Sequence, residues 1–378
     1  MLSSYPSPIP LPQGERIKVR VKKGIPMHQV NLGIIGCGVI GTIHIQNAAK
    51  SKLINLIAVA DQIEERRREV AEKFGIKKTY SSGEALLKDP DVEAVVLALP
   101  TGMRASLALR AFNSGKHVLL EKPAAMNAGE LKQMINACGE LVGACCSSRY
   151  RFLESADFTA DFIAGGALGK LRVVRCRATS AAGPPPRKTP PSWRVNKALN
   201  GGGILVNWGP YDLDYLLGIT GWSIRPKLVL AQTWPIPPQF QCHVAPGSDA
   251  EEHFAAMIRC EGGTVIIFER GEQVAAQSEN AWQLIGTKGS LQLKMIAEKE
   301  KKVVFNNSST EKGVFSEVIW EGDEDSSRVH SGPVNDFARA IREKCQPKTG
   351  LEQALVIQKI TDAIYASSEQ GKAIEINQ

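Results

Sequence analysis

The chain has 378 residues, of which 43% are hydrophobic and 22% charged, with 46 basic against 39 acidic side chains. This composition is typical of a soluble globular protein with two domains and argues against a largely disordered chain. Acidic residues are interspersed among the basic ones, and no apolar run reaches the ~20 residues of a membrane helix. We therefore expect neither nucleic acid nor a membrane as the partner.

The first 27 residues differ from the rest of the chain. Four prolines stand among the first twelve positions, and the apolar core of a secretory signal is missing. We expect residues 1–27 to be a disordered extension, with Met27 as an alternative start of translation. The eight cysteines have no CxxC spacing. They predict reduced, buried side chains in a cytoplasmic protein, and no metal site.

A glycine-rich turn follows the first predicted strand. Residues 30–35 form a short apolar run, which indicates a buried strand. Next comes a GxGxxG pattern at Gly36, Gly38 and Gly41, then a helical pattern, then a second apolar run that ends at Asp61. Between a strand and a helix, this pattern is typical of a dinucleotide site in which the helix N-terminus faces the pyrophosphate.

The acid after the second strand bears on the choice of cofactor. Asp61 would accept hydrogen bonds from the adenosine ribose and repel a 2′-phosphate, which favours NAD over NADP. Arg66 and Arg67 follow closely and weaken that preference. The expected cofactor contacts come from the glycine turn, this acid and the ends of later strands: Gly36, Gly38, Val39, Ile40, Gly41, Asp61, Leu99, Pro100, Thr101, Glu121 and Lys122.

Three further strand-like runs follow, at residues 94–100, 116–123 and 143–150, with helical segments between them. Alternating strands and helices predict a parallel sheet, which binds ligands at the carboxyl ends of its strands. Lys122 comes at the end of the second run and is therefore expected beside the nicotinamide. The alternative is a surface lysine paired with Glu121.

Three segments together resemble the glucose–fructose oxidoreductase, inositol dehydrogenase and MocA family. They are the glycine pattern, GKHVLLEKPAA at 115–125 and GGGILVNWGPYDLDYLLG at 201–218. The resemblance implies an α/β protein with an N-terminal Rossmann domain at 28–150. It also implies a C-terminal α/β domain at 151–378, built on a large, mainly antiparallel sheet. The implied activity is NAD(P)-linked oxidation or reduction of sugars, cyclitols or related polyols.

The resemblance also assigns roles to single residues. In this family the lysine of the EKP motif, here Lys122, hydrogen-bonds the reacting oxygen. An aspartate and, four residues later, a histidine usually follow the glycines, but here these positions hold Asn207 and Tyr211. Tyrosine at the second position resembles glucose–fructose oxidoreductase and some ketosugar reductases. Arg104 is a further departure, because many members have a histidine there, near the nicotinamide.

The segment after the three glycines predicts a helix with one polar face. Asn207 and Tyr211 are four residues apart and lie on one side of a helix, with Asp214 close to the same line. Pro210 is expected to interrupt or kink the helix. A nearby ammonium lowers a tyrosine pKa, so Tyr211 is the expected base, with Lys122 stabilising the alkoxide. Asn207 would orient the hydroxyl or Lys122. The alternative is that Tyr211 is an ordinary core tyrosine.

Other polar and aromatic side chains are candidates for contact with the substrate. Together with the polar helix face, the expected set is Arg149, Trp193, Arg194, Asn207 and Tyr211. Arg149 is expected at the end of the last strand of the first domain. Trp193 would either stack on a sugar or anchor its own loop, and Asp212 and Asp214 would either bind substrate or pair with an arginine.

The second half contains strand-like runs at 171–178, 226–233, 253–260, 264–270, 281–286 and 290–296. They suit a broad sheet, one face of which needs cover. We therefore expect a homodimer or a homotetramer.

Two other functions stay open. A glycosidase that uses bound NAD transiently would release an aglycone without net NADH. A regulator of the same fold would bind the nucleotide without catalysis. The residues at 207 and 211 favour this second possibility because they depart from the common pattern, whereas the presence of Lys122 and Tyr211 argues against it.

Overall fold

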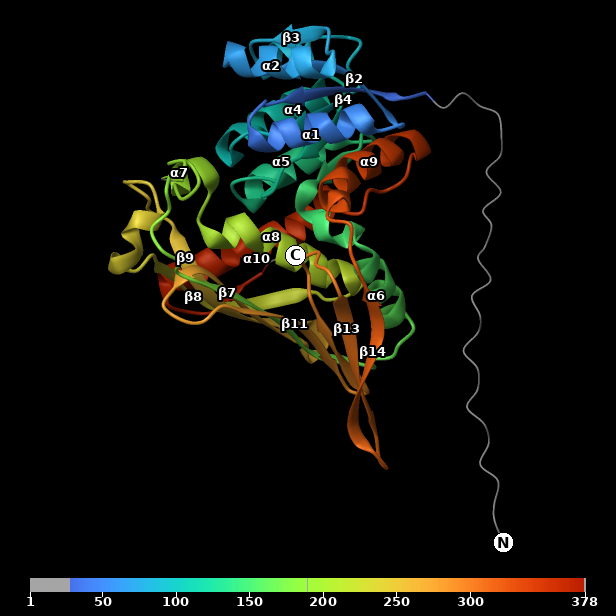
Figure 1. Ribbon diagram of the computed structural model, residues 1–378, viewed down its shortest axis with the longest axis vertical. Helices are drawn as coiled ribbons and strands as arrows, with labels where there is room; N and C mark the ends of the chain where they lie inside the picture. Colours follow the sequence, from blue (N-terminus) through green and yellow to red (C-terminus); the bar gives the residue numbers. More distant parts are fainter. Residues whose placement is uncertain (1–27, 189, 377–378) are drawn as a thin grey trace.

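The computed structural model describes residues 28–376 apart from residue 189, which form two lobes (Figure 1). The upper lobe in this view contains a six-stranded sheet with its helices, and the lower lobe contains a nine-stranded sheet. The extension expected at residues 1–27, with its alternative start at Met27, lies outside the described residues.

The six-stranded sheet is parallel throughout, with the strand order β3-β2-β1-β4-β5-β6. Its central strands are short apolar runs covered by helices on both faces. The strands are β1 Val30–Ile35, β2 Ile54–Ala60, β3 Lys78–Tyr80, β4 Ala94–Leu97, β5 His117–Leu120 and β6 Gly143–Cys145. The helices between them are α1 Val39–Lys50, α2 Glu64–Phe74, α3 Gly83–Leu87, the short 3-10 helix η1 Thr101–Met103, α4 Arg104–Asn113 and α5 Ala128–Cys138.

The order of the strands reverses between β1 and β4, because β2 lies on one side of β1 and β4 on the other. In open α/β sheets, ligands bind outside the carboxyl ends of the strands at such a point. The glycine turn follows β1, Pro100 follows β4 and Lys122 follows β5. The predicted cofactor residues thus come from loops at one edge of the sheet.

The nine-stranded sheet has the order β14-β13-β12-β11-β7-β10-β9-β8-β15, and all its neighbours are antiparallel except β7 and β10. The strands are β7 Leu171–Ala181, β8 Pro226–Pro235, β9 Glu251–Cys260, β10 Val265–Val274, β11 Glu279–Gly286, β12 Gly289–Leu293, β13 Lys301–Ser309, β14 Gly313–Gly322 and β15 Ile374–Glu375. The six predicted runs correspond to β7–β12, and β13, β14 and β15 are not among them. The predicted fold class, a Rossmann sheet plus a largely antiparallel sheet, is confirmed.

Helices cover one face of the large sheet. They are α6 Glu154–Ala164, α8 Ile204–Ile219 and α10 Leu351–Gln370, and α8 shares a buried core with Phe254, Phe268 and Trp282 of the strands. Helix α9 Ser327–Glu343 instead packs against α1 of the upper lobe. The remaining short elements are η2 Cys146–Phe152, α7 Lys197–Asn200, η3 Pro238–His243 and η4 Glu261–Gly263. None of the helices in the described ranges is long and apolar enough to cross a membrane.

The other face of the large sheet carries exposed apolar side chains. Leu230, Met257 and Ile267 are cross-strand neighbours on β8, β9 and β10, and all three are exposed.

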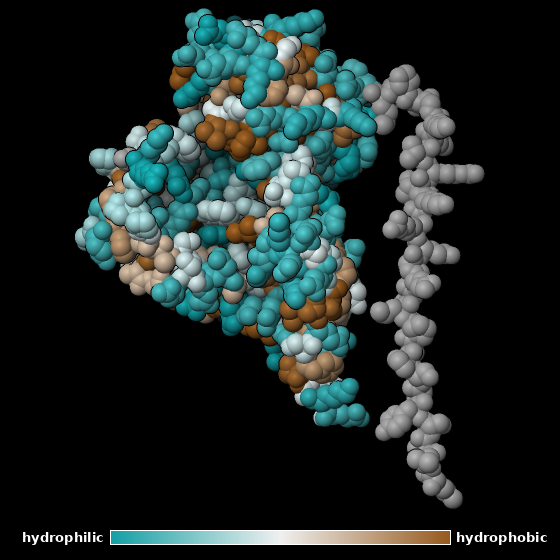
Figure 2. All heavy atoms as spheres, viewed as in Figure 1, coloured by the Kyte–Doolittle hydropathy of each residue, from teal (hydrophilic) through white to brown (hydrophobic). Residues whose placement is uncertain are grey.

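The hairpin of β13 and β14 projects from the lower end of the molecule (Figure 1), and apolar side chains gather near it in Figure 2. Contiguous apolar surface of this kind marks contact sites between proteins.

Two local predictions are wrong. The strand expected at 143–150 ends at Cys145, and η2 replaces its second half because the arginines of this segment turn inward to buried carboxylates. Pro210 does not interrupt α8, which runs unbroken through it. Most of this helix is buried, so its packing outweighs the one backbone hydrogen bond that proline removes.

Candidate active site

The glycine turn joins β1 to α1 in a conformation that excludes side chains. Gly36 has a φ of 99°, and a Cβ atom there would overlap the carbonyl oxygen of Ala98. A Cβ at Gly41 would overlap the carbonyl oxygen of Gly36, so the absence of a side chain lets α1 approach the turn. At Gly38, a Cβ would meet nothing within 4 Å, so this part of the backbone borders open space.

The start of α1 is free to bind an anion. Val39, its first residue, is 85% exposed, and no side chain caps the helix at Gly38. The first N–H groups of the helix therefore lack partners in it. Asp61 accepts hydrogen bonds from the N–H of Cys37 at 2.7 Å and from that of Ile63 at 2.8 Å, which leaves further acceptor sites on its carboxylate. These residues fit a dinucleotide, with the pyrophosphate on α1 and the ribose at Asp61.

Arg104 is buried beneath the ends of β4 and β5. It donates to oxygens of the two segments that follow these strands: the carbonyls of Leu99 (2.7 Å), Lys122 (3.3 Å), Glu121 and Pro123, and the hydroxyl of Thr101 (3.0 Å). The guanidinium thus uses all five of its N–H donors inside the protein. Arg104 fixes the backbone that carries Lys122, a role that its place in the sequence did not reveal.

The amine of Lys122 connects the two lobes. Its Nζ atom donates to the main-chain oxygen of Asn207 at 2.6 Å and to the side-chain oxygen of the same residue at 3.2 Å. It also lies over the ring of Tyr211, 4.9 Å from the ring centre. The structure therefore brings Lys122, Asn207 and Tyr211 together, as the helical spacing of the last two predicts.

Burial lowers the pKa of Lys122 to about 7. The carboxylate of Glu121 opposes this effect, while the guanidinium groups of Arg149, Arg104 and Arg194 add to it. Near neutral pH a large part of the amine is therefore uncharged. An uncharged amine still donates hydrogen bonds and can also accept a proton.

Tyr211 is buried, and its hydroxyl accepts a hydrogen bond from Arg149 at 2.9 Å. Burial raises its pKa well above the ordinary value, and the charge of Arg149 offsets only part of that effect. The lowered pKa predicted from the neighbouring Lys122 is wrong, because the cost of burying a phenolate exceeds the attraction of nearby cations. At neutral pH Tyr211 keeps its proton and is a hydrogen-bond donor.

The carboxylate of Glu121 is held inside the protein. It pairs with Arg149, accepts a hydrogen bond from His44 at 2.7 Å and accepts another from the N–H of Lys122 at 3.1 Å. Although burial raises the pKa of Glu121, Arg149 and His44 hold it well below the usual range. Arg149 lies in η2 rather than at a strand end, and this single side chain contacts both Glu121 and Tyr211.

The two aspartates of α8 are paired with arginines rather than free for substrate. Asp212 accepts from Arg270 at 2.5 and 3.2 Å and from Trp282 at 3.0 Å. Asp214 accepts from three donors: Ser147 (2.6 Å), Arg151 (2.7 Å) and Thr349 (2.8 Å). Helical spacing puts Asp214 near the line of Asn207 and Tyr211, but at that turn of the helix Ser147 and Arg151 of η2 bind its carboxylate.

The loop before α8 is attached to the upper lobe. The hydroxyl of Thr101 donates to the side-chain oxygen of Asn200 at 3.0 Å, and Arg194 pairs with Glu272 of β10 at 2.8 Å. Trp193 is 43% exposed, so it does not serve as a buried anchor of this loop. Its exposed ring is compatible with the predicted contact to a sugar.

Comparison with known proteins identifies the family. Residues 30–147 match the model of an oxidoreductase family with an NAD-binding Rossmann fold, and residues 159–292 match the GFO/IDH/MocA C-terminal domain. The chain belongs to the Gfo/Idh/MocA oxidoreductase family. The predicted resemblance, and NAD as the cofactor of its Rossmann domain, are thereby confirmed.

Individual proteins are also similar to this Gfo/Idh/MocA chain in sequence or in structure. An uncharacterized oxidoreductase of Rhizobium meliloti is 27% identical over 352 residues, which are 91% of this chain and 98% of the relative. Myo-inositol 2-dehydrogenase of Thermotoga maritima is 30% identical over 193 residues, 50% of this chain and 55% of the relative. The structure of levoglucosan dehydrogenase with NADH superposes with a TM-score of 0.79 at 22% identity, covering 93% of this chain and 100% of that one.

A cluster of possible metal ligands in this Gfo/Idh/MocA chain was not predicted from sequence. His44, Glu121 and Cys146 bring ligand atoms within 4.8 Å of one another, although they are far apart in the chain. Arg149 already occupies the carboxylate of Glu121, and burial raises the pKa of the Cys146 thiol well above its ordinary value. A guanidinium beside a protonated thiol repels a cation, so these donors do not fit a metal ion.

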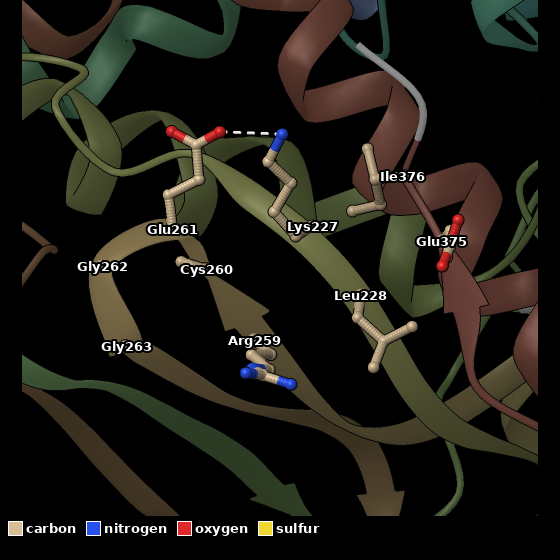
Figure 3. Close-up of a pocket in the computed structure, with 9 residues that line it drawn as sticks. All are labelled: Lys227, Leu228, Arg259, Cys260, Glu261, Gly262, Gly263, Glu375 and Ile376. Carbon is tan, nitrogen blue, oxygen red and sulfur yellow. Dashed lines mark ion pairs between the residues drawn. The ribbon is translucent and has the colours of Figure 1, made fainter.

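A surface pocket at the other end of the large sheet is separate from this site (Figure 3). It is lined by the start of β8, the end of β9 and β15, and Lys227 pairs there with Glu261 at 2.7 Å. The pocket reaches Cys260 at the last position of β9, whereas the start of that strand lies beside α8. None of the predicted site residues lines it.

Proposed function

We propose that this chain is an NAD-linked dehydrogenase that transfers a hydride between a hydroxyl of a sugar, cyclitol or related polyol and nicotinamide. The observation that carries the proposal is the amine of Lys122, which Asn207 holds beside Tyr211 at the carboxyl end of β5. Two relatives support the substrate class by name, myo-inositol 2-dehydrogenase and levoglucosan dehydrogenase.

The proposed mechanism divides the work among three side chains. When bound, NAD would supply the acceptor or donor of the hydride. Lys122, as a free amine, would direct its hydrogens to the two oxygens of Asn207 and accept the proton of the substrate hydroxyl on its lone pair. Tyr211 would donate its O–H to the substrate oxygen while Arg149 fixes the phenol from the other side. Trp193 and Arg194 complete the proposed substrate contacts.

The proposed cofactor preference is NAD over NADP. Asp61 would take the ribose hydroxyls, and its charge disfavours a 2′-phosphate. Arg67, which weakens this preference in the sequence, donates to the carbonyl oxygen of Asp61 at 3.3 Å and pairs with Glu64 at 3.6 Å. One of the two nearby arginines is thus engaged within the protein.

The test of the function is the absorbance of reduced nicotinamide with a panel of sugars, cyclitols and glycosides, run with NAD and with NADP. We expect NADH to form with one class of polyol, and more slowly or not at all with NADP. Release of an aglycone without net NADH would instead indicate the redox-cycling glycosidase. Tight binding of NAD without turnover of any compound would indicate the regulator.

The variant Asn207→Asp is expected to shift the pH dependence of catalysis. A carboxylate 3.2 Å from Nζ would favour the ammonium form and raise the pKa of Lys122 from about 7. Because oxidation needs the free amine, kcat/KM rises with pH up to that pKa in the wild type. In the variant this rise should move to higher pH by about one unit or more. An unchanged profile of kcat/KM against pH would contradict the role of Lys122 as base.

We also propose that the chain forms a homodimer or homotetramer in the cytoplasm. The exposed row of Leu230, Met257 and Ile267 supports burial of the open sheet face against a second copy. Light scattering of the purified protein should give a mass of about two or four chains. Leu230→Lys should reduce that mass, and a monomeric wild type would contradict the proposal.

A further inference from the structure

Glu252 is a buried carboxyl group near the candidate active site without a hydrogen-bond donor among the described residues. It is 5% exposed, the second residue of β9, and next to the fully engaged Glu251. Burial raises the pKa of Glu252 to about 8; the charge of Glu272 adds to this effect and that of Arg194 opposes it. A buried carboxyl that lacks a partner is costly, so its retention calls for a reason.

The strand around Glu252 is built irregularly. Trp234 of β8 lies opposite His253, and the next residue, Pro235, lies opposite Glu251, so Glu252 is an extra residue in the ladder. On the other side of β9, strand β10 is irregular at the same level, where Gln273 has a φ of 57°. Such bulges redirect side chains and are over-represented next to active sites.

Glu252 lies at the end of the sheet where α8 begins. The neighbouring Glu251 accepts hydrogen bonds from the N–H groups of Gly203 at 3.0 Å and Leu205 at 3.0 Å, at the first turn of α8. Asn207, which holds Lys122, follows in the same part of this helix. Glu252 therefore stands on the sheet beside the helix end that contributes to the site.

Arg194 relates Glu252 to the reacting centre. Its ion-pair partner Glu272 comes directly after Gly271, which pairs across the strands with His253, the neighbour of Glu252. Arg194 is held there by its ion pair with Glu272, at 2.8 Å, and by the loop that Asn200 attaches to Thr101 of the upper lobe. Through Glu272 and Asn200, Arg194 therefore links the end of the large sheet that carries Glu252 to the Rossmann domain.

Three carboxylates around the site are paired with arginines. Arg149 pairs with Glu121, Arg270 with Asp212 and Arg194 with Glu272. The neighbouring Glu251 accepts from N–H groups and from Tyr365, whereas Glu252 has neither an ion pair nor a hydrogen-bond donor within the described part of the chain. Its oxygens are therefore available to a ligand, as the other carboxylates are not.

We propose that Glu252 is a specificity-determining residue that hydrogen-bonds one hydroxyl of the sugar, remote from the carbon that is oxidised. The proposal rests on the proposed dehydrogenase function and adds a second point of recognition to the one at Lys122. A site that bonds a substrate hydroxyl rejects the analogue without it, because the protein group is then buried unpaired.

The test compares D-glucose, levoglucosan and myo-inositol with their monodeoxy derivatives, in the wild type and in Glu252→Leu and Glu252→Gln. In the wild type, loss of one particular hydroxyl should lower kcat/KM about tenfold or more. In Glu252→Leu, loss of the same hydroxyl should lower kcat/KM by less than about threefold. For the parent compound, this variant should change KM rather than kcat. Glu252→Gln, which keeps a hydrogen-bonding group of the same shape, should retain most of the discrimination.

Glu317→Leu, an exposed carboxyl replaced on the edge strand β14, is the matched control and should behave as the wild type. Binding of the same sugars to the NADH-saturated protein, measured by calorimetry, provides a readout that needs no turnover. Equal penalties for every deoxy sugar in the wild type and in Glu252→Leu would overturn the role of Glu252 alone. Absence of both binding and oxidation with all three parent compounds would overturn it together with the proposed substrate class.

Discussion

The variant Lys122→Met is expected to lower kcat/KM for polyol oxidation by about 100- to 10,000-fold, the range of general acid–base catalysis. Methionine has a similar length but can neither accept the hydroxyl proton nor stabilise the developing alkoxide. The loss should be seen in kcat as well as in kcat/KM, because the amine acts in the transition state. Initial rates of NADH formation with the best polyol of the panel measure it.

The same variant should fold at least as well as the wild type. Lys122 has a pKa of about 7 in the folded chain, below the ordinary 10.5 of an exposed lysine. The unfolded chain therefore binds this proton more tightly, and the charge disfavours folding below about pH 10. Removing the amine should leave the urea midpoint unchanged or raise it at pH 7.

The controls separate catalysis from binding. Lys312→Met, on the exposed turn before β14, should have wild-type rates. NADH should bind to Lys122→Met within about threefold of the wild-type affinity, since the glycine turn and Asp61 are intact. A loss of activity below tenfold in Lys122→Met would mean that another group takes the proton.

Most of the fold could be predicted from local patterns in the sequence. The glycine spacing and the acid after the second strand identify the Rossmann unit because each depends on backbone geometry that few residues allow. The helical spacing of Asn207 and Tyr211 also gives the side of α8 that meets Lys122. These features are determined within about twenty residues of chain.

Contacts between residues that are far apart in the chain could not be predicted from the sequence. Asp214 lies near the polar face of α8, but its carboxylate accepts hydrogen bonds from η2 and from Thr349 and is not free for a substrate. The raised pKa of Tyr211 depends on how many groups surround it, which spacing does not reveal. The EKP motif also does not show that Arg104 donates hydrogen bonds to the backbone carbonyls around Lys122.

One signal in the sequence was available and was missed. Glu251 and Glu252 stand together just before the apolar alternation of β9, where the pattern of a half-buried strand has no place for two adjacent acids. Such a conflict between a local rule and the fold is expected at functional or capping positions. Here one acid caps α8 and the other is the proposed specificity residue.

Arg149→Met is expected to lower the free energy of unfolding by about 3–5 kcal/mol at pH 8, the cost of breaking a buried ion pair. The substitution leaves the carboxylate of Glu121 buried with His44 and one N–H as partners, and Tyr211 loses a hydrogen bond. Urea denaturation measures the change. Arg328→Met, which breaks an exposed pair with Glu154, is the matched control and should cost less than about 1 kcal/mol.

The pH dependence of this effect has a definite sign. In the wild type the lowered pKa of Glu121 gives stability that is present above the ordinary carboxyl pKa and is lost as the pH falls. Without Arg149, burial dominates and the carboxyl gains by taking up a proton, so the deficit should be smaller at pH 5.5 than at pH 8. Adding Glu121→Gln should recover part of the loss at pH 8, since it removes the unpaired charge. A double variant as unstable as the sum of its parts would show that Arg149 stabilises the fold through contacts other than Glu121.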